Sequence, residues 1–364
     1  MRLSSINNIN FYGKIIDSHV HIGNWSENGV QRDYTNDIDV FIKSTLDNGD
    51  TVEKVLVSNL DCMTRKDGGF YSDETVGNKR LLELAAKNPK IAPLATCQPG
   101  YGDVENIRKL LRENPDKFVG FKFHPEQLNI PVSDSRYQAY MEFAKEMNLP
   151  CLFHSARSLD VTYPDGGIGK ASVLSNPEQI YELAKRNKDV KVVMAHWGGD
   201  GEANIDITTR CIVDSIKKKD AKLYADISWV DCDNPQKPNI KRIIEQLKSE
   251  NGLDRILFGT DAPLGRFGSK QEYEKTINDI KSMIRREFSS EAEDIIDKIF
   301  YSNAKKVFLS KQKPSQGKPT PPPEPPKGNK KLKFLIAAGL LILGAAGWYF
   351  YNKHNKSNSV DIRA

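Results

Sequence analysis

Apolar and polar positions form two recurring patterns along the first 310 residues. Short apolar runs of strand length are followed by longer stretches in which apolar residues recur every three or four positions, as on one face of a helix. The runs predict eight strands, at residues 14–22, 53–60, 91–98, 118–124, 150–156, 190–198, 222–229 and 255–261. Helices are predicted between strands, among others at residues 78–88, 103–114, 137–147, 176–187 and 239–250.

This order of elements indicates the fold class. Eight strand–helix units over about 300 residues are the count and the length of an α/β TIM barrel, (β/α)8. A doubly wound open sheet usually has fewer strands, and no G-x-G-x-x-G motif opens a helix after the first predicted strand. The sequence therefore predicts a TIM barrel at residues 1–310.

The pattern changes after residue 310. Residues 311–333 are rich in proline and lysine, with PPPEPP at 321–326, and this composition predicts an extended linker rather than a core. Residues 334–351 contain no charged side chain, and 18 residues at 1.5 Å each just cross the hydrocarbon core of a bilayer. We expect one C-terminal transmembrane helix here, followed by a short polar tail at residues 352–364.

Charge and cysteine usage predict the location of the barrel. Seven lysines precede the predicted helix and three basic residues follow it, so the positive-inside rule places the barrel in the cytoplasm. The N-terminus has no apolar leader, and the five cysteines show no C-x-x-C spacing, which fits a reducing compartment. The sequence predicts a single-pass, C-terminally anchored protein with its catalytic domain facing the cytoplasm.

The net charge of +5 resides in the tail rather than in the barrel. Residues 311–364 hold 10 basic and 2 acidic side chains, whereas residues 1–310 hold 43 basic and 46 acidic ones. A slightly acidic barrel has no surface suited to a phosphate backbone, so no nucleic-acid partner is expected. A small-molecule substrate is expected instead, and the sequence is compatible with a homo-oligomer.

Five of the six histidines lie at or near the carboxyl ends of predicted strands, where TIM barrels carry their active sites. They are His19, His21, His124, His154 and His196, and Asp261 ends the eighth strand. Alternate side chains of a strand point the same way, so these groups can converge on the barrel mouth. One such histidine is usually a hydrogen-bonded core residue, but five at the same end indicate a shared site. Imidazoles with a carboxylate suit a divalent metal, Zn²⁺ first and Mn²⁺ as an alternative.

Several segments resemble one known family, the amidohydrolase superfamily. D-x-H-x-H at residues 17–21 resembles its strand-one signature, and FGTDAP at residues 258–263 resembles its strand-eight segment with a metal-binding aspartate. Strand-four, strand-five, strand-six and closing segments of the family resemble residues 120–125, 153–154, 195–199 and 301–304. Together they resemble the amidohydrolase-related branch that includes aminocarboxymuconate-semialdehyde decarboxylase, over about residues 14–310.

The resemblance implies roles for the strand-end residues. One divalent ion would be bound by four of them: His19, His21, His154 and Asp261. His196 would polarise a substrate carbonyl or carboxylate, and Asp261 would also carry a proton.

Lys122 leaves a second arrangement open. Binuclear relatives carry a carbamylated lysine on strand four, with the strand-five and strand-six histidines, here His154 and His196, on the second ion. Otherwise Lys122 and His124 would contact the substrate.

Four further residues are weaker candidates for substrate binding. Arg157 and Arg266 each follow a ligand strand and would bind a substrate carboxylate, unless they are ordinary surface residues. Trp25 and Trp197 either wall the pocket or pack the rim of the barrel.

Three functions are compatible with these residues. The leading hypothesis is hydrolysis of an ester, lactone or amide of a small organic substrate by metal-activated water. The alternative is non-oxidative decarboxylation of an unsaturated or aromatic acid at the same metal. The third, a non-catalytic membrane-tethered scaffold, predicts missing ligands, whereas all of the expected ones are present.

Overall fold

The computed structural model describes residues 13–27, 30–42, 45–66, 68–156, 160–199, 202–232, 234, 239–264 and 269–310. All of them belong to one compact unit, Met1–Pro314. The predicted linker, transmembrane helix and polar tail lie outside the described residues. Among the helices of the described residues, none combines the length and the apolar character that a membrane crossing requires.

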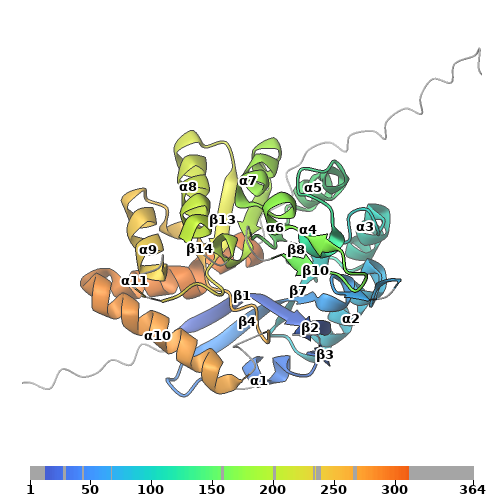
Figure 1. The fold of residues 1–364 in the computed structure, drawn as a ribbon. Coiled ribbons are helices and arrows are strands. Elements are labelled where there is room, and N and C mark those ends of the chain that lie inside the picture. The colour runs from blue at the N-terminus through green and yellow to red at the C-terminus, as the bar shows by residue number, and fades with distance from the viewer. Residues whose placement is uncertain are drawn as a thin grey trace, which may run out of the picture. The chain divides into compact units, whose positions relative to one another are not determined.

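Eight parallel strands form one sheet at the centre of this unit (Figure 1). In spatial order they are β1 (Lys14–Ile22), β4 (Thr51–Asn59), β7 (Ile91–Thr96), β8 (Gly120–Phe123), β9 (Cys151–Phe153), β12 (Lys191–Met194), β13 (Lys222–Asp226) and β14 (Ile256–Leu257). Each strand overlaps one predicted strand, in the predicted order. The six strands from β7 to β14 in this order are shorter than the predicted runs, because pairing stops before the polar residues at their carboxyl ends, whereas β1 and β4 keep the predicted length or exceed it.

The sheet curls until its two edge strands meet. After β14, the Asp261 N–H donates to the His19 carbonyl at 2.7 Å, and the His21 N–H donates to the Ala262 carbonyl at 2.8 Å. A parallel bridge also joins Val20 to Ala262. The eight strands thus form a nearly closed barrel, which confirms the predicted TIM-barrel class.

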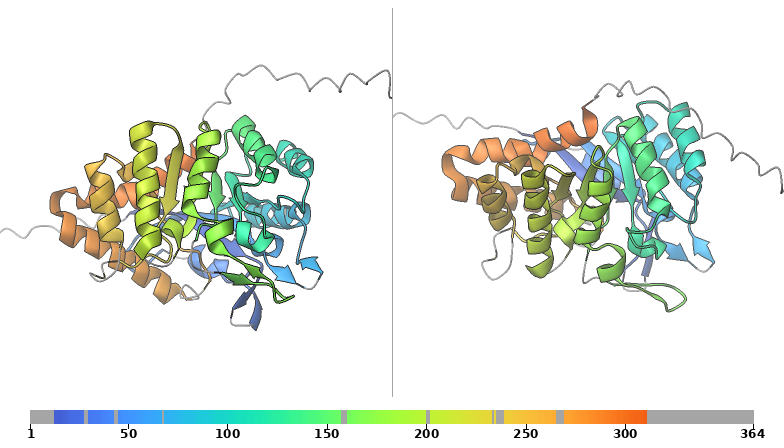
Figure 2. Two further views of the ribbon diagram at one scale, coloured as in Figure 1. Left: turned by 45° about the horizontal axis from the view of Figure 1, so that its top comes forward. Right: turned by 90° about the horizontal axis from the view of Figure 1, so that it is seen from above.

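Helices surround the strands, as Figure 1 and both views of Figure 2 show. They are α1 (Ile38–Ile42), α2 (Glu74–Lys87), α3 (Val104–Glu113), α4 (Pro125–Leu128), α5 (Arg136–Met147), α6 (Ala171–Leu174), α7 (Pro177–Arg186), α8 (Glu202–Lys218), α9 (Ile240–Ser249), α10 (Lys270–Phe288) and α11 (Ala292–Asp297). The five helices delimited from the sequence are confirmed as α2, α3, α5, α7 and α9. Side-chain oxygens cap several amino ends; Asp73, for example, accepts from the N–H groups of Thr75 and Val76 before α2.

Three short hairpins extend the loops between barrel strands. They are β2–β3 (Asn24–Glu27 and Val30–Asp33), β5–β6 (Arg65–Lys66 and Gly69–Phe70) and β10–β11 (Val161–Thr162 and Ile168–Gly169). All three follow the carboxyl end of a barrel strand, so they belong to the mouth of the barrel, where functional loops of this fold lie.

One apolar cluster fills the barrel interior. It takes residues from seven of the eight strands and from the last helical turns: Ile16, Leu56, Ala92, Leu94, Leu152, Val193, Ala195, Tyr224, Leu257, Ala304, Val307 and Phe308. Ala304, Val307 and Phe308 close the end at which the strands begin. The opposite end, where the strands finish, is left to the polar groups.

Candidate metal centre

Three donor atoms from the first and last strands converge inside the barrel mouth. The Nε2 atoms of His19 and His21 are 3.1 Å apart, and Asp261 Oδ1 lies 3.2 Å from the first and 2.8 Å from the second. All three residues are buried. His19 and His21 lie on β1, whereas Asp261 follows β14, so the closing of the barrel brings them together.

The other nitrogen of each histidine is already engaged. His19 Nδ1 is 3.1 Å from Asp226 Oδ2, and His21 Nδ1 is 2.8 Å from Ser58 Oγ. Burial alone would raise the pKa of Asp226. Attraction to His19 and hydrogen bonds from His19 and Ser228 outweigh this effect, so the pKa lies well below its ordinary value. An ionised Asp226 accepts from Nδ1–H, and this leaves the Nε2 lone pair of His19 facing the centre.

This donor set fits a divalent cation. Burial lowers the pKa of His21 to about 4, so its imidazole is neutral at pH 7. The pKa of Asp261 lies well below its ordinary value, because attraction to His19 and His196 outweighs the effect of burial. Lone pairs facing one another at about 3 Å repel unless a proton or a cation lies between them. Ligands placed about 2.0–2.2 Å from a zinc ion stand roughly 3.0–3.5 Å apart, which matches these separations.

Lys122 reaches the same centre from β8. Its side chain is fully buried, and its Nζ lies 2.7 Å from His19 Nε2. Burial lowers the pKa of Lys122 to about 8, although Asp261 and Asp226 act in the opposite direction. Both arrangements expected for Lys122, with a second ion or with substrate, stay predictions.

His154 and His196 form a second group beside the first. His196 Nε2 lies 3.2 Å from His154 Nδ1, and His196 Nδ1 lies 2.7 Å from Ser228 Oγ. The Ser228 hydroxyl donates to Asp226 Oδ1, so its oxygen accepts from His196 Nδ1–H, and the Nε2 atom of His196 carries the lone pair. Burial holds the pKa of His196 well below its ordinary value.

Two sets of close ligand atoms exist among the described residues, and His154 belongs to neither. One set is His19, His21 and Asp261; the other is His19, His196 and Asp226. His154 instead contacts His196, lies 3.4 Å from Glu126 through its Nε2, and stacks on His124 with ring centroids 3.9 Å apart. The expectation that His154 shares the ion with His19 and His21 therefore stays a prediction.

Four residues at or just after strand ends have left-handed backbone conformations that residues other than glycine rarely adopt. Their φ angles are 58° for His196, 48° for Trp197, 62° for Trp229 and 66° for Asp261. Each such residue costs of order 1 kcal/mol or more, and such residues cluster at functional sites. Trp229 uses this conformation to donate its indole N–H to Asp261 Oδ2 at 2.8 Å.

The four weaker candidates for substrate binding differ in where they lie. Trp197 is fully buried and donates its indole N–H to Thr209 on α8, so it packs the rim of the barrel. Trp25 is half-buried on β2, with its ring centroid 6.1 Å from that of His124. Arg157 and Arg266 lie outside the described residues.

The structure adds site residues that the sequence interpretation missed: Ser58, Glu126, Asp226, Ser228 and Trp229. Asp226 ends the apolar run of β13, and this is the same signal that singled out the histidines. Glu126, in the first turn of α4, and the two serines follow no comparable pattern.

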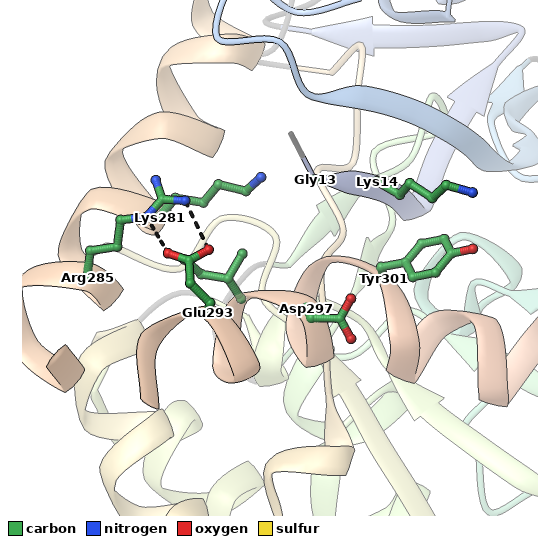
Figure 3. A pocket seen from close by; sticks show the side chains of 8 residues that line it. Gly13, Lys14, Lys281, Arg285, Glu293, Asp297 and Tyr301 are labelled. Carbon is green, nitrogen blue, oxygen red and sulfur yellow. Dashed lines mark hydrogen bonds and ion pairs between the residues drawn. The ribbon is translucent and has the colours of Figure 1, made fainter. Parts of the chain in front are cut away.

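A separate hollow of about 440 Å³ lies where β1 begins, at the opposite end of the barrel (Figure 3). Its basic side chains are paired: Lys14 with Glu53, Lys281 with Asp50, and Arg285 with Glu293. Figure 3 shows the last of these pairs, joined by dashed lines. The basic charges of this hollow are thus matched by acidic side chains within the protein.

Comparison with known proteins supports the same family as the site residues. The family model described as amidohydrolase matches residues 70–309, about two-thirds of the chain. No match was found among curated proteins.

Solved structures share the fold at low sequence identity. A "probable 2-pyrone-4,6-dicarboxylic acid hydrolase" from Acinetobacter baumannii, with citric acid bound, is 16% identical with a TM-score of 0.53, covering 81% of this chain and 99% of that one. Amidohydrolase 2 from Bifidobacterium longum subsp. infantis is 15% identical (TM-score 0.50; 81% and 98% covered). An amidohydrolase from Burkholderia multivorans with bound zinc is 14% identical (TM-score 0.50; 82% and 99% covered). With a nearly closed eight-stranded barrel, a His–His–Asp centre at its mouth and a family match over most of the barrel, the chain belongs to the amidohydrolase family.

Proposed function

We propose that this protein is a metal-dependent hydrolase that uses metal-activated water on an ester, lactone or amide of a small organic substrate. The observation that carries the proposal is the convergence of His19 Nε2, His21 Nε2 and Asp261 Oδ1 within 3.2 Å of one another. These three residues would hold the ion, with His154 and Lys122 as candidates to complete its coordination. Zn²⁺ is the first ion to test, because this donor set suits it and the B. multivorans relative binds zinc.

A divalent ion bound there would polarise a carbonyl group and lower the pKa of a water molecule. The chain's own groups would handle the protons. Asp261 Oδ1 faces the other ligands, so Oδ2 is the oxygen that would take a proton and pass it to the leaving group. His196 would contact the substrate through Nε2, because its Nδ1 is bound to Ser228.

The test is metal analysis of the full chain purified without added metal, beside a His19→Ala/His21→Ala variant. His354→Ala is the matched control, because this histidine lies outside the predicted barrel. About one equivalent of Zn or Mn, lost only in the double variant, would support a single ion. About two equivalents would bring Lys122 into the coordination. A folded chain that cannot be loaded with metal would refute the proposed function.

An assay then separates hydrolysis from its alternatives. The loaded enzyme would be offered lactones, esters and amides beside unsaturated and aromatic carboxylic acids. Release of acid without carbon dioxide supports hydrolysis, and release of carbon dioxide supports a decarboxylase. Metal binding without turnover of any of them supports the scaffold interpretation.

We also propose that residues 334–351 anchor the enzyme in a membrane, with the barrel on the cytoplasmic side. The support is the stretch of 18 residues without a charge and the lysines that precede it. The full chain is expected to stay with membranes after carbonate extraction, and a variant lacking 334–351 is expected to be released. Release of the full chain would contradict the anchor.

A further inference from the structure

Glu126 is a buried carboxylate that the proposed function does not yet use. It lies in the first turn of α4, two residues after His124, and is fully buried. The Ser175 hydroxyl donates to its Oε1 atom, whereas Oε2 is buried with no hydrogen-bond partner among the described residues. Burying a carboxylate that is only partly hydrogen-bonded is costly, so its retention calls for an explanation.

The immediate neighbour of this carboxylate is His154. His154 Nε2 lies 3.4 Å from Glu126 Oε1, and the opposite nitrogen, Nδ1, lies 3.2 Å from His196 Nε2. The His154 ring also stacks on His124 with an angle of 10° between the planes. The ring therefore has a carboxylate at one nitrogen, an imidazole lone pair at the other and a flat neighbour on its face.

A similar but closer arrangement occurs on the other side of the site, where a hydrogen bond of 3.1 Å joins His19 to Asp226, against the 3.4 Å between His154 Nε2 and Glu126 Oε1. His19 has the carboxylate of Asp226 at Nδ1 and directs Nε2 toward the metal centre. A buried carboxylate behind a histidine fixes which nitrogen carries the proton and raises the basicity of the nitrogen in front. Glu126 lies at Nε2 of His154, whereas Asp226 lies at Nδ1 of His19. The nitrogen that faces the site is therefore Nδ1 in His154 and Nε2 in His19.

We propose that Glu126 is the positioning residue for His154: it holds the proton on Nε2 and leaves the Nδ1 lone pair facing His196 Nε2. Two imidazole lone pairs then meet at 3.2 Å, and a bound cation relieves their repulsion. Without a cation the same contact is a hydrogen bond that needs a proton on one of the two nitrogens. Glu126 thereby prepares Nδ1 of His154 as the atom that takes up a ligand. The Nε2–H tautomer is therefore expected in the metal-bound chain, and in this respect the proposal rests on the proposed function.

The loop that follows β9 holds Glu126 in place. Ser175 binds its side chain, and the Tyr163 hydroxyl donates to its backbone carbonyl. A side chain at Gly169 would come within 2.9 Å of that carbonyl, so the β10–β11 hairpin packs directly on Glu126. Ser175 thus holds the carboxylate and the hairpin holds the backbone of Glu126, both from the segment that follows β9.

The experiment reads the tautomer of His154 in the zinc-loaded full chain. Histidine rings are labelled with ¹⁵N, and long-range ¹H–¹⁵N correlations are recorded at pH 8, above the ordinary imidazole pKa of about 6.5. The chain has only six histidines, and a His154→Gln variant assigns the signals. The wild type is expected to show the proton of His154 on Nε2. A proton fixed on Nδ1 would overturn the proposal without any variant of Glu126.

Variants at Glu126 complete the test. Glu126→Met removes the acceptor at similar size, and His154 is expected to lose its fixed Nε2–H tautomer. Glu126→Gln keeps a carbonyl acceptor and should restore it. The matched control is Glu74→Gln, which alters another buried carboxylate, one that accepts from Gln98 N–H and the Tyr140 hydroxyl. It should leave the His154 signals unchanged, and an unchanged tautomer in a folded Glu126→Met variant would refute the proposal.

A functional readout follows for the zinc-loaded protein. Loss of an outer carboxylate typically lowers metal affinity or activity by about 10- to 100-fold, so Glu126→Met should weaken Zn²⁺ binding or lower kcat to that extent, with partial recovery in Glu126→Gln. The two proposals can fail separately. A tautomer that depends on Glu126 in a chain without hydrolase activity would refute only the proposed function.

Discussion

The two ends of the barrel treat buried charge in opposite ways. Where the strands begin, Lys281 and Asp50 are both buried and lie 2.6 Å apart as opposite charges. Where the strands end, three potential metal-ligand atoms face one another: two imidazole nitrogens and a carboxylate oxygen converge at 2.8 to 3.2 Å. One end satisfies its charges within the chain, whereas the other presents a set that an added cation would complete.

This difference indicates that the two ends of the barrel have different roles. Opposite charges paired at the beginning of the strands contribute to the fold, whereas the converging ligand atoms and strained backbone at the carboxyl ends are placed for chemistry. Changes at the two ends should therefore be separable, with one set acting on metal and activity and the other on the free energy of unfolding.

The largest effect is expected at the mouth from Asp261→Asn. The amide keeps the shape but loses the anionic ligand and the proton carrier. Activity on any substrate that the assay identifies should fall by roughly a thousandfold or more, and the metal content should fall with it. Thermal unfolding should change little in the metal-free protein. Full metal content in this variant would show that Asp261 is not a ligand.

The opposite end should respond in stability alone. Lys281→Met leaves Asp50 buried without its partner, which typically costs about 3–5 kcal/mol of unfolding free energy. Urea unfolding measures the loss, and metal bound by the remaining folded protein should be unchanged. The control is Lys275→Met, since the exposed pair of Lys275 with Asp279 is worth less than about 1 kcal/mol. A loss of metal from the folded Lys281→Met protein would contradict the separation of stability and metal binding between the two ends.

A smaller effect is expected from Trp229→Phe. This change keeps an aromatic ring but removes the N–H that binds Asp261 Oδ2. Metal affinity or kcat should fall by about 10- to 100-fold, with little change in unfolding. Zinc titration and steady-state kinetics are the measurements. If both stay within twofold of the wild type, the backbone alone positions Asp261.

The smallest effect concerns a buried carboxylate whose two oxygens both have partners. Burial raises the pKa of Glu74 above its ordinary value, although hydrogen bonds from Gln98 and Tyr140 oppose the change. The folded state therefore binds this proton more tightly than the unfolded state. The stability that Glu74 contributes relative to Glu74→Gln is present below the unfolded pKa and is lost as pH rises through the folded pKa. Urea unfolding of both proteins from pH 4 to pH 7 should show this difference shrinking, and a growing difference would contradict the sign.

The fold and part of the site were predictable because each depends on periodic patterns. Eight apolar runs predicted the barrel strands, and strand-end positions predicted His19, His21 and Asp261, which do converge. Asp226 carried the same signal and was overlooked among the histidines. Glu126 and Ser228 could not be predicted, because their roles depend on which tautomer a neighbouring ring adopts. Nor could the position of His154 relative to the others, since strand ends converge without specifying which side chains meet.

The closing of the barrel has a consequence for how the protein matures. His19 and Asp261 are separated by most of the domain in sequence, yet the Asp261 N–H donates directly to the His19 carbonyl. During synthesis the first histidines leave the ribosome long before this aspartate does, and on their own they form only part of the centre. We therefore expect metal to be acquired as the last strand docks on the first. Ion uptake would then report completion of the whole barrel, and a chain cut short before Asp261 would fail to retain the metal.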